Sequence, residues 1–401
     1  MSQNLPQKKI IIIGGGPAGM TAAIELSKHH NVHLYEKGKT LGRKFLVAGK
    51  GGFNLSNNVI GTDLLSKYSP EEFLNNILLN FDTKATKTWL YDLGIPTYVG
   101  SSGRIFPEKG IKPIEVLNAF KNKIISQGGK IHYEHEFKSF DSKKINFLKE
   151  GKIIHVEYDY CVFALGGGSW SVTGSKGDWL QSFEENNIKT LPFEASNCGL
   201  EVDFNNKEIN NFIGTPLKNI QINCNGKTIK GEAVISKYGL EGNAIYPISS
   251  IAREALHTNS NAFLEIDLKP FNTEEELLTK ITETTLPKNY RYIFNLNKSQ
   301  IALIKSFTNK ETYLNPLAFS KTLKRIKIPI LKLRPVEEAI STVGGISLDE
   351  LNNDLSLKKM PHIYITGEMF DWDTITGGYL LQGCFSTAMY ASKHIHLKIE
   401  N

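Results

Sequence analysis

The chain has 401 residues, of which 40% are hydrophobic and 22% are charged, and its formal net charge is +6 at pH 7. These values are those of an ordinary globular protein that is long enough to form two or more domains, and they exclude a disordered chain. No apolar run in the sequence approaches the length of a membrane span, and the four cysteines form no C-x-x-C pair. The sequence therefore predicts a cytoplasmic protein without a metal site, a disulfide framework or a membrane segment.

The first predicted feature is a glycine-rich turn between a buried strand and a helix. The predicted elements are a strand over residues 10–13, a helix over 21–28 and a second strand over 32–35. Gly14, Gly16 and Gly19 have the G-x-G-x-x-G spacing that permits a tight turn, the approach of a pyrophosphate and close helix–strand packing. Glu36 ends the second strand, where its carboxylate can accept a hydrogen bond from a ribose hydroxyl. The pattern predicts dinucleotide binding, and the alternative is a glycine-rich turn without a ligand.

A basic loop rich in glycine follows Glu36. Arg43, Lys44 and Lys50 supply positive charge, and Gly51 and Gly52 leave backbone amides uncovered. Such a loop suits an anionic group of a bound dinucleotide. The alternative is a surface loop with scattered charges.

Helices and short strands are predicted up to about residue 160. Ser69, Pro70 and Glu72 have the pattern of a capping box with proline at the first helical position, which predicts a helix that ends near residue 80. Further predicted elements are helices over 83–93 and 113–127, a strand over 130–134 and a small antiparallel sheet over 144–158. An apolar strand over 160–165 then runs into a turn at Gly166 and Gly167.

A strand-like pattern with many turn residues begins near residue 191, and the pattern of the first domain returns only after about residue 345, which predicts an inserted domain. Residues 191–255 and about 325–344 are expected to be rich in β-structure, and residues about 256–324 are expected to be helical. The run from Lys321 to Arg334 carries six basic residues and no acid. This run is either a solvated basic face or a surface for an anionic partner such as RNA.

The C-terminal segment specifies which dinucleotide is predicted. A short strand ends at Gly367 and Glu368, and Gly377 and Gly378 open a helix of small and apolar residues. Bare amides at such a helix N-terminus stabilise the negative charge of a reduced flavin, and Glu368 can bind ribityl hydroxyls. An extended FAD needs this second site and an NAD dehydrogenase does not, so the sequence predicts FAD. The alternative is a C-terminal helix that packs on the sheet through small residues.

The predicted fold is α/β. A Rossmann-type FAD-binding domain of the two-motif flavoprotein kind is formed by residues 1–190 and 345–401, and residues 191–344 form an inserted substrate domain with a β-barrel-like part and a helical part.

Several of these motifs together resemble a known family. Gly42-Arg43-Lys44, the glycine-rich loop that ends at Asn54 and Asn57, the Gly166-Gly167 turn, Tyr238 to Gly242, and Thr376 to Tyr379 are similar to the YhiN/BaiN-type bacterial flavoproteins. The resemblance implies an NAD(P)/FAD-dependent oxidoreductase and covers essentially the whole chain. Activities in the family include reduction of unsaturated steroid intermediates, oxidation of aminoacetone and reduction of uridine in ribosomal RNA. Many members carry Gly-Gly-Arg-Cys-Asn where this chain has Gly51-Gly52-Phe53-Asn54, so this divergent branch lacks that cysteine.

The predicted function is NAD(P)H-driven hydride transfer through FAD to an activated C=C bond, with the reductase direction preferred to the oxidase direction. The alternatives are an RNA-modifying flavoenzyme that uses the basic insert, and a flavin-binding protein without turnover. The nicotinamide is expected to visit only transiently, because a second G-x-G-x-x-G is absent from the sequence. No catalytic residue is assigned. The predicted FAD-binding residues are Gly14, Gly16, Pro17, Ala18, Gly19, Glu36, Lys37, Arg43, Lys44, Gly49, Lys50, Gly51, Gly52, Asn54, Phe137, Gly166, Gly167, Gly367, Glu368, Asp373, Gly377, Gly378 and Tyr379.

Overall fold

The computed structural model describes residues 8–48, 52–259 and 262–400. The chain divides into two compact units: unit 1 is Met1–Glu194 with Ser341–Asn401, and unit 2 is Ala195–Ile340. Each unit has its own cluster of buried hydrophobic side chains. Unit 2 is therefore an insertion in the sequence of unit 1.

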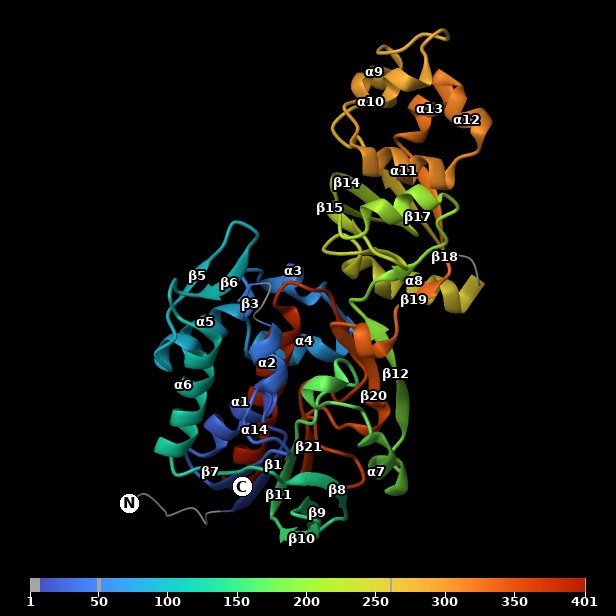
Figure 1. The fold of residues 1–401 in the computed structure, drawn as a ribbon. Coiled ribbons are helices and arrows are strands. Elements are labelled where there is room, and N and C mark those ends of the chain that lie inside the picture. Colours follow the sequence, from blue (N-terminus) through green and yellow to red (C-terminus); the bar gives the residue numbers. More distant parts are fainter. Residues whose placement is uncertain (1–7, 49–51, 260–261, 401) are drawn as a thin grey trace. The chain divides into compact units, whose positions relative to one another are not determined.

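Unit 1 is built on a five-stranded parallel sheet with the strand order β21-β11-β1-β2-β7 (Figure 1). Its strands are β1 (Lys9–Ile13), β2 (Asn31–Tyr35), β7 (Lys130–His132), β11 (Tyr160–Phe163) and β21 (Ile363–Ile365). Three helices of this unit are α1 (Pro17–Leu26), α6 (Pro113–Ser126) and α14 (Tyr379–Glu400). Four consecutive isoleucines make β1 a fully buried central strand, as expected of a parallel sheet that is covered on both faces. The predicted α/β Rossmann-type fold is confirmed.

Among its described residues, unit 1 also contains five further helices and several antiparallel strands. The remaining helices of unit 1 are α2 (Arg43–Ala48), α3 (Gly61–Leu65), α4 (Glu71–Asn80), α5 (Thr83–Asp92) and α7 (Leu180–Glu185). A three-stranded antiparallel sheet consists of β8 (Glu136–Phe140), β9 (Lys144–Lys149) and β10 (Lys152–Glu157), and another consists of β3 (Ser56–Asn57), β5 (Thr97–Val99) and β6 (Arg104–Pro107). Two strand pairs complete the unit, namely β4 (Tyr68–Ser69) with β22 (Asp373–Thr374) and β12 (Thr190–Ser196) with β20 (Ser341–Ile346).

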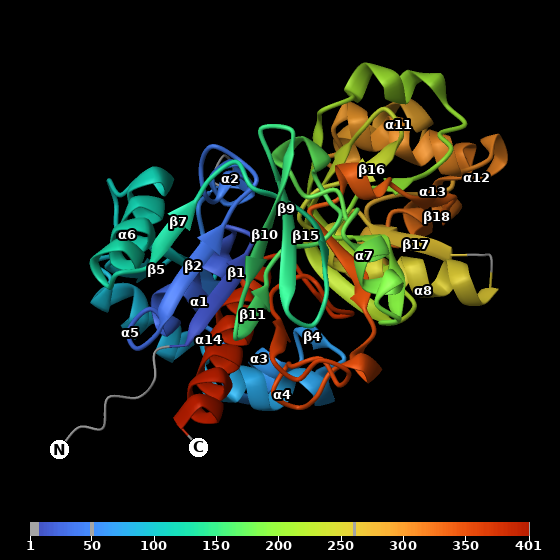
Figure 2. The same cartoon turned by 90° about the horizontal axis from the view of Figure 1, so that it is seen from below.

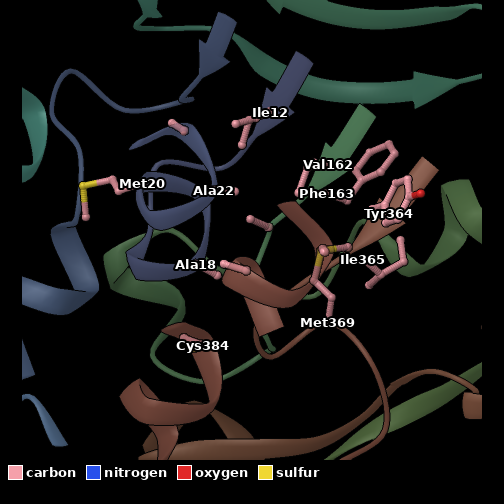
Figure 3. Close-up of a cluster of buried hydrophobic side chains, with 14 of the residues drawn as sticks. Ile12, Ala18, Met20, Ala22, Val162, Phe163, Tyr364, Ile365, Met369 and Cys384 are labelled. Atoms are coloured by element: carbon pink, nitrogen blue, oxygen red, sulfur yellow. The ribbon is translucent and has the colours of Figure 1, made fainter. Parts of the chain in front are cut away.

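The core of unit 1 joins residues from both ends of the chain. Figure 3 shows Ile12 of β1, Ala18 of α1, Phe163 of β11 and Ile365 of β21 gathered in one buried cluster. Because β1 and β21 are joined only through β11, the N-terminal and C-terminal segments must both be in place to complete the sheet.

Two helix beginnings differ from those predicted. Helix α1 begins at Pro17 rather than at residue 21, because proline fits the first helical position directly after the glycine turn. Helix α4 begins at Glu71 with Pro70 as its N-cap, and no side-chain capping bond forms there. The predicted capping box from Ser69 to Glu72 is therefore wrong, although the helix ends at the predicted Asn80.

Unit 2 combines an antiparallel sheet with short helices. The sheet has the strand order β18-β17-β14-β15-β16-β13-β19, with β13 (Leu200–Glu201), β14 (Pro216–Cys224), β15 (Lys227–Ile235), β16 (Gly239–Glu241), β17 (Ala262–Asp267), β18 (Ile326–Ile330) and β19 (Lys332–Leu333). The helices are α8 (Ser249–Asn259), α9 (Glu274–Leu278), α10 (Tyr290–Ile293), α11 (Lys298–Phe307), α12 (Lys310–Leu314) and α13 (Pro316–Thr322). Figure 2 shows β17 and β18 close together in this unit. Strand β17 lies within the predicted helical segment, which is a correction: its alternating buried residues pair it with β14 and β18.

Among the helices that the structure describes, we find none whose length and apolar character would let it span a membrane.

Candidate functional site

A cavity of about 360 Å³ lies in unit 1 at the carboxyl ends of the parallel strands. Ile13, Tyr35, Ala164 and Thr366 line it, and each ends or directly follows one of the strands β1, β2, β11 and β21. In open α/β sheets this edge is where nucleotides bind. The predicted FAD-binding residues that line the cavity are Gly14, Gly16, Pro17, Ala18, Glu36, Lys37, Arg43, Lys44, Phe137, Gly166, Gly367 and Glu368.

The three glycines of the β1–α1 turn have different surroundings. A Cβ at Gly14 would lie 2.2 Å from the carbonyl oxygen of Ala164, and one at Gly19 would lie 1.9 Å from the carbonyl oxygen of Gly14. A Cβ at Gly16 would meet no described atom within 4 Å, although Gly16 lines the cavity. Gly14 and Gly19 therefore serve close backbone packing, and Gly16 leaves open the space that a phosphate would occupy.

The N-terminus of α1 faces this open space without a cap. Gly16 is the N-cap residue and supplies no side chain, and the first turn of α1 contains no acidic residue. Its free N–H groups and the positive end of the helix dipole favour an anion.

Glu36 is fixed by two backbone amides at the end of β2. Its Oε2 accepts a hydrogen bond from the Gly15 N–H at 2.8 Å, and its Oε1 accepts one from the Gly38 N–H at 2.7 Å. Each carboxylate oxygen has a second lone pair. The carboxylate is thus held in one orientation and can still accept a bond from a hydroxyl in the cavity.

Aromatic rings form the wall beside Glu36. The Tyr35 ring stacks between His132 and Phe147, with ring centroids 4.4 Å apart on each side. His135 and Phe137 also line the cavity. Because both faces of Tyr35 are covered, a planar base can meet only the edge of that ring, and the other rings in the lining are those of His135 and Phe137.

A partly buried ion pair lies at the other end of the cavity. Lys44 Nζ donates to Ser169 Oγ at 2.7 Å and lies 3.3 Å from Glu368 Oε2. Glu368 Oε1 accepts from the Thr342 N–H at 2.9 Å. A Cβ at Gly167 would lie 2.0 Å from Thr342 Oγ1, so Gly167 packs behind the ion pair and does not line the cavity.

The turn before α14 is held by residues from the glycine-rich loop. Asn57 Nδ2 donates to the Gly377 carbonyl at 3.0 Å. With its amide oriented to satisfy both neighbours, Asn54 accepts from the Gly378 N–H at 2.9 Å and donates to the Gly52 carbonyl at 3.3 Å. A Cβ at Gly378 would lie 2.4 Å from the Ser56 carbonyl oxygen. The expectation that the Gly378 N–H is free is therefore wrong, because this N–H donates a hydrogen bond to the Asn54 side chain.

Several predicted residues lie away from the cavity lining. They are Gly19, Gly52, Asn54, Gly167, Asp373, Gly377, Gly378 and Tyr379. Asp373 is buried in β22, opposite Ser69 of β4, and the Tyr379 carbonyl accepts a hydrogen bond from the Tyr68 hydroxyl at 2.7 Å. The predicted residues Gly49, Lys50 and Gly51 lie outside the described residues.

The sequence interpretation missed the loop that follows the Gly166 turn. The cavity-lining residues of this loop are Thr173, Gly174, Ser175, Lys176, Asp178 and Trp179. Gly174 and Gly177 have φ values of +119° and +71°, and Lys37 Nζ donates to the Gly174 carbonyl. The glycines at 174 and 177 were the available signal, since both allow backbone conformations that other residues rarely adopt.

The basic run in unit 2 is largely paired with acids from other segments. Among the described residues, five of its six cations have a carboxylate partner, in the pairs Lys321–Glu274 (3.9 Å), Lys324–Asp267 (2.6 Å), Arg325–Glu265 (2.5 Å), Lys332–Glu201 (3.5 Å) and Arg334–Glu201 (2.6 Å). The Lys327 ammonium lies 4.1 Å from the centroid of the Phe263 ring. The positive potential of this run is therefore weaker than its sequence suggests.

The whole chain has recognisable relatives. The sequence profile of the HI0933-like protein Rossmann domain matches residues 8–394. The 3-dehydro-bile acid delta(4,6)-reductase of Clostridium scindens is 23% identical over 425 residues, which cover 96% of this chain and 98% of that protein. The ribosomal RNA dihydrouridine synthase of Escherichia coli is 24% identical over 391 residues, which cover 94% of this chain and 95% of that protein. The crystal structure of 3-ketosteroid delta1-dehydrogenase from Sterolibacterium denitrificans has a similar fold, with 11% identity and a TM-score of 0.54 over 98% of this chain and 100% of that one.

Proposed function

We propose that this chain, which belongs to the HI0933-like protein Rossmann domain family, binds FAD and acts as an FAD-dependent oxidoreductase. The observation that carries the proposal is the open space beside Gly16 at the uncapped N-terminus of α1. It lies in one cavity with Glu36 and the Lys44–Glu368 pair. A dinucleotide needs a phosphate site between two sugar-binding ends, and this cavity offers that order of groups.

Each part of the cavity has a proposed role. The backbone amides of Gly16 and Ala18 would hold the pyrophosphate, because the Gly14 and Gly15 amides are already bonded within the protein and Pro17 has none, and Glu36 would bind the adenosine ribose. At the other end, Glu368 would accept a bond from a ribityl hydroxyl. Lys44 would place a positive charge near the ring, where it stabilises the negative charge that forms on reduction. When bound, FAD supplies the hydride-transfer chemistry.

The cofactor assignment is tested by Gly16→Val. Gly16 has a φ of −78°, which valine adopts without strain, so the added side chain should project into the phosphate space and leave the fold intact. We expect the wild type to be purified yellow and to release FAD on denaturation, and the variant to lose at least tenfold in FAD affinity. Gly231→Val, on β15 of unit 2, is the control and should bind FAD normally. Release of FMN, or no flavin after reconstitution, would contradict the proposal.

The finer proposal is that NAD(P)H is the electron donor and an activated C=C bond is the acceptor. It is supported by the names of two relatives, a delta(4,6)-reductase and a dihydrouridine synthase, since both describe addition of hydrogen to a double bond. Mixing with NADH and with NADPH under anaerobic conditions should bleach the flavin absorbance with at least one of them. Bleaching by a small amine and by neither nucleotide would instead identify an oxidase. Bleaching by no donor would favour a flavin-binding protein without turnover.

RNA as the substrate is the second candidate, and the name of the Escherichia coli relative favours it. Because carboxylates partly neutralise the basic run, we do not expect this run to be the main contact with RNA. If RNA binds through it, affinity should fall log-linearly with salt, and replacing Lys324, Arg325 and Lys327 by glutamate should weaken binding without changing FAD content. Salt-independent or absent RNA binding in the wild type would leave a small molecule as the substrate.

A further inference from the structure

Arg104, on strand β6 of unit 1, has a guanidinium group without a partner among the described residues. Of the described arginines, Arg104, Arg253 and Arg334 are partly enclosed and the others are exposed. Arg253 donates to the Ala195 carbonyl, and Arg334 is paired with Glu201. The Arg104 guanidinium forms no hydrogen bond or ion pair with a described residue. Charged groups that are partly removed from water are usually paired, so this group indicates a site for a ligand oxygen.

A second unpaired polar group lies at the first residue of α14. Tyr379 is 6% exposed, and its hydroxyl forms no hydrogen bond with a described residue. The hydroxyl oxygen is not one of the fully enclosed polar atoms that lack a partner, so it retains contact with solvent and a ligand can reach it. Because burial raises the pKa of Tyr379, the hydroxyl keeps its proton near neutral pH and can donate a hydrogen bond.

Strand pairing and side-chain contacts bring the two groups together. In the antiparallel pair of β3 and β6 (Figure 1), Arg104 lies opposite Asn57, so the two side chains leave the same face of the sheet. Asn57 Nδ2 donates to the Gly377 carbonyl at 3.0 Å, and a Cβ at Gly377 would lie 3.1 Å from Cε2 of the Tyr379 ring. Burial raises the pKa of Tyr379 and the Arg104 cation lowers it, so the guanidinium lies within electrostatic range of the hydroxyl.

This pair lies next to the proposed flavin end of the dinucleotide cavity. Tyr379 precedes Cys384 by five residues, or about 7.5 Å along α14. Cys384 lines that cavity, and its Sγ would lie 3.8 Å from a Cβ at Gly367, the residue before Glu368. Glu368 is the residue proposed to bind a ribityl hydroxyl. A substrate whose oxygen contacts Arg104 and Tyr379 would therefore lie beside the flavin ring.

We propose that Arg104 and Tyr379 bind the carbonyl oxygen of the substrate, and that the substrate is an α,β-unsaturated carbonyl compound. The inference rests on the proposed FAD-dependent reduction of an activated C=C bond. A guanidinium and a hydroxyl both donate hydrogen bonds, and no carboxylate among the described residues pairs with either one. They therefore suit an oxygen on which negative charge develops. An unactivated alkene offers no such oxygen.

Negative charge develops on this oxygen during the reduction. Transfer of a hydride from the reduced cofactor forms a C–H bond at the β-carbon, the C=C electron pair moves between the α-carbon and the carbonyl carbon, and the C=O pair moves to oxygen. A proton from water then adds to the α-carbon and the carbonyl group is restored. The substrate gains two electrons and two hydrogens, and the cofactor is oxidised until NAD(P)H reduces it again. Arg104 and Tyr379 would stabilise the enolate oxygen, where the charge is greatest.

Two probes that differ by one methyl group test the proposal by calorimetry on the oxidised, FAD-loaded protein at pH 8. 4-Nitrophenol is largely ionised there and, like an enolate, presents a negatively charged oxygen in a planar molecule. 4-Nitroanisole carries a methyl group on that oxygen and is neutral. We expect 4-nitrophenolate to bind saturably at one site and 4-nitroanisole to bind at least tenfold more weakly, as expected for loss of a hydrogen bond to a charged group.

Two substitutions connect this preference to the named side chains. Arg104→Gln should weaken 4-nitrophenolate binding at least tenfold and leave 4-nitroanisole binding within about twofold, because only the phenolate uses the charge. Tyr379→Phe should weaken 4-nitrophenolate by about fivefold, the value of one hydrogen bond. Tyr379→Phe removes only an unpaired hydroxyl, so it should fold and decides the outcome even if Arg104→Gln does not fold.

Further variants separate a binding role from a structural one. Arg104→Lys retains the charge and should recover part of the affinity. Arg291→Gln, at an exposed arginine of α10, is the matched control and should bind both probes as the wild type does. All variants should keep their FAD, measured by flavin absorbance, because none of these side chains lines the dinucleotide cavity.

The outcomes distinguish this inference from the proposed function. Absence of FAD from the wild type would contradict the proposed function and this inference with it. With FAD bound, the inference alone would be overturned by a lack of saturable 4-nitrophenolate binding or by equal affinities for the two probes. An unchanged 4-nitrophenolate affinity in either Arg104→Gln or Tyr379→Phe would also overturn it.

Discussion

Gly19, in the first turn of α1, leaves no room for a methyl group. Gly19→Ala would place its Cβ 1.9 Å from the Gly14 carbonyl oxygen, a backbone atom that cannot move away freely. We expect a loss of about 1–3 kcal/mol in unfolding free energy, as for other overpacked sites, measured by urea denaturation. Gly231→Ala, whose Cβ would meet its nearest neighbour at 3.4 Å, should be close to neutral. Equal stabilities of the two variants would contradict this account of the turn.

The Lys44 side chain lines the cavity and contacts Ser169 and Glu368. Lys44→Met keeps the length of the side chain but removes the cation beside Ser169 and Glu368. If this charge stabilises the reduced cofactor, the variant should retain FAD and be reduced at least tenfold more slowly by the same donor, as followed by stopped-flow absorbance. Lys44→Arg keeps the charge and should recover part of the rate. A reduction rate unchanged in Lys44→Met would assign the ion pair to packing alone.

Histidines whose pKa is lowered by burial make the stability of the protein depend on pH, and His30 and His132 are two of them. Burial is the main cause that lowers the pKa values of His30 and His132 from 6.5 to about 4 in the folded state. The unfolded chain therefore binds more protons between about pH 6.5 and 4, so stability is present above pH 6.5 and is lost as the pH falls through this window. Replacing both histidines by glutamine should flatten the dependence of unfolding free energy on pH there. Urea titrations at pH 7, 6 and 5 would show whether the slope is reduced.

At the scale of elements, the hydrogen bond that Asn54 accepts from the Gly378 N–H fixes the glycine turn that precedes α14. Asn54→Ala would free the Gly378 amide, and we expect its hydrogen exchange to accelerate by about fivefold, the value of one hydrogen bond. The neighbouring Asn58 is exposed, so Asn58→Ala should leave the exchange unchanged. Mass-spectrometric exchange in the cofactor-free protein measures this without reference to activity. Equal exchange in the two variants would mean that Asn54 does not hold the turn.

The elements also show what the sequence could and could not predict. The β1–α1–β2 unit can be predicted from the sequence because its pattern is local. Four isoleucines, three spaced glycines and an acidic residue follow one another along the chain. The family resemblance was confirmed by the match over residues 8–394. Strand β17 was missed because its partners β14 and β18 are distant in sequence. The occupied Gly378 amide was missed for the same reason, since Asn54 lies more than 300 residues away.

At the scale of the whole molecule, the two separate cores predict that unit 2 can fold alone. Residues 195–340 contain their own seven-stranded sheet and their own buried cluster. We expect this fragment to unfold in a single cooperative transition by circular dichroism and to bind no FAD. The charge pairs Lys324–Asp267 and Arg325–Glu265 join parts of the same unit, so they remain intact in the fragment. A non-cooperative transition would show that unit 2 depends on unit 1.

The order of the strands has a consequence for how the protein is made on the ribosome. Strands β1, β2, β7 and β11 are synthesised early, but their edge partner β21 and the helix α14 emerge only after all of unit 2. During that interval, the exposed edge of β11 and the apolar side chains that later contact α14 must stay free of other nascent chains. Early folding of unit 2 cannot relieve this exposure. Chaperone dependence should therefore fall sharply once residues beyond about 390 have left the exit tunnel.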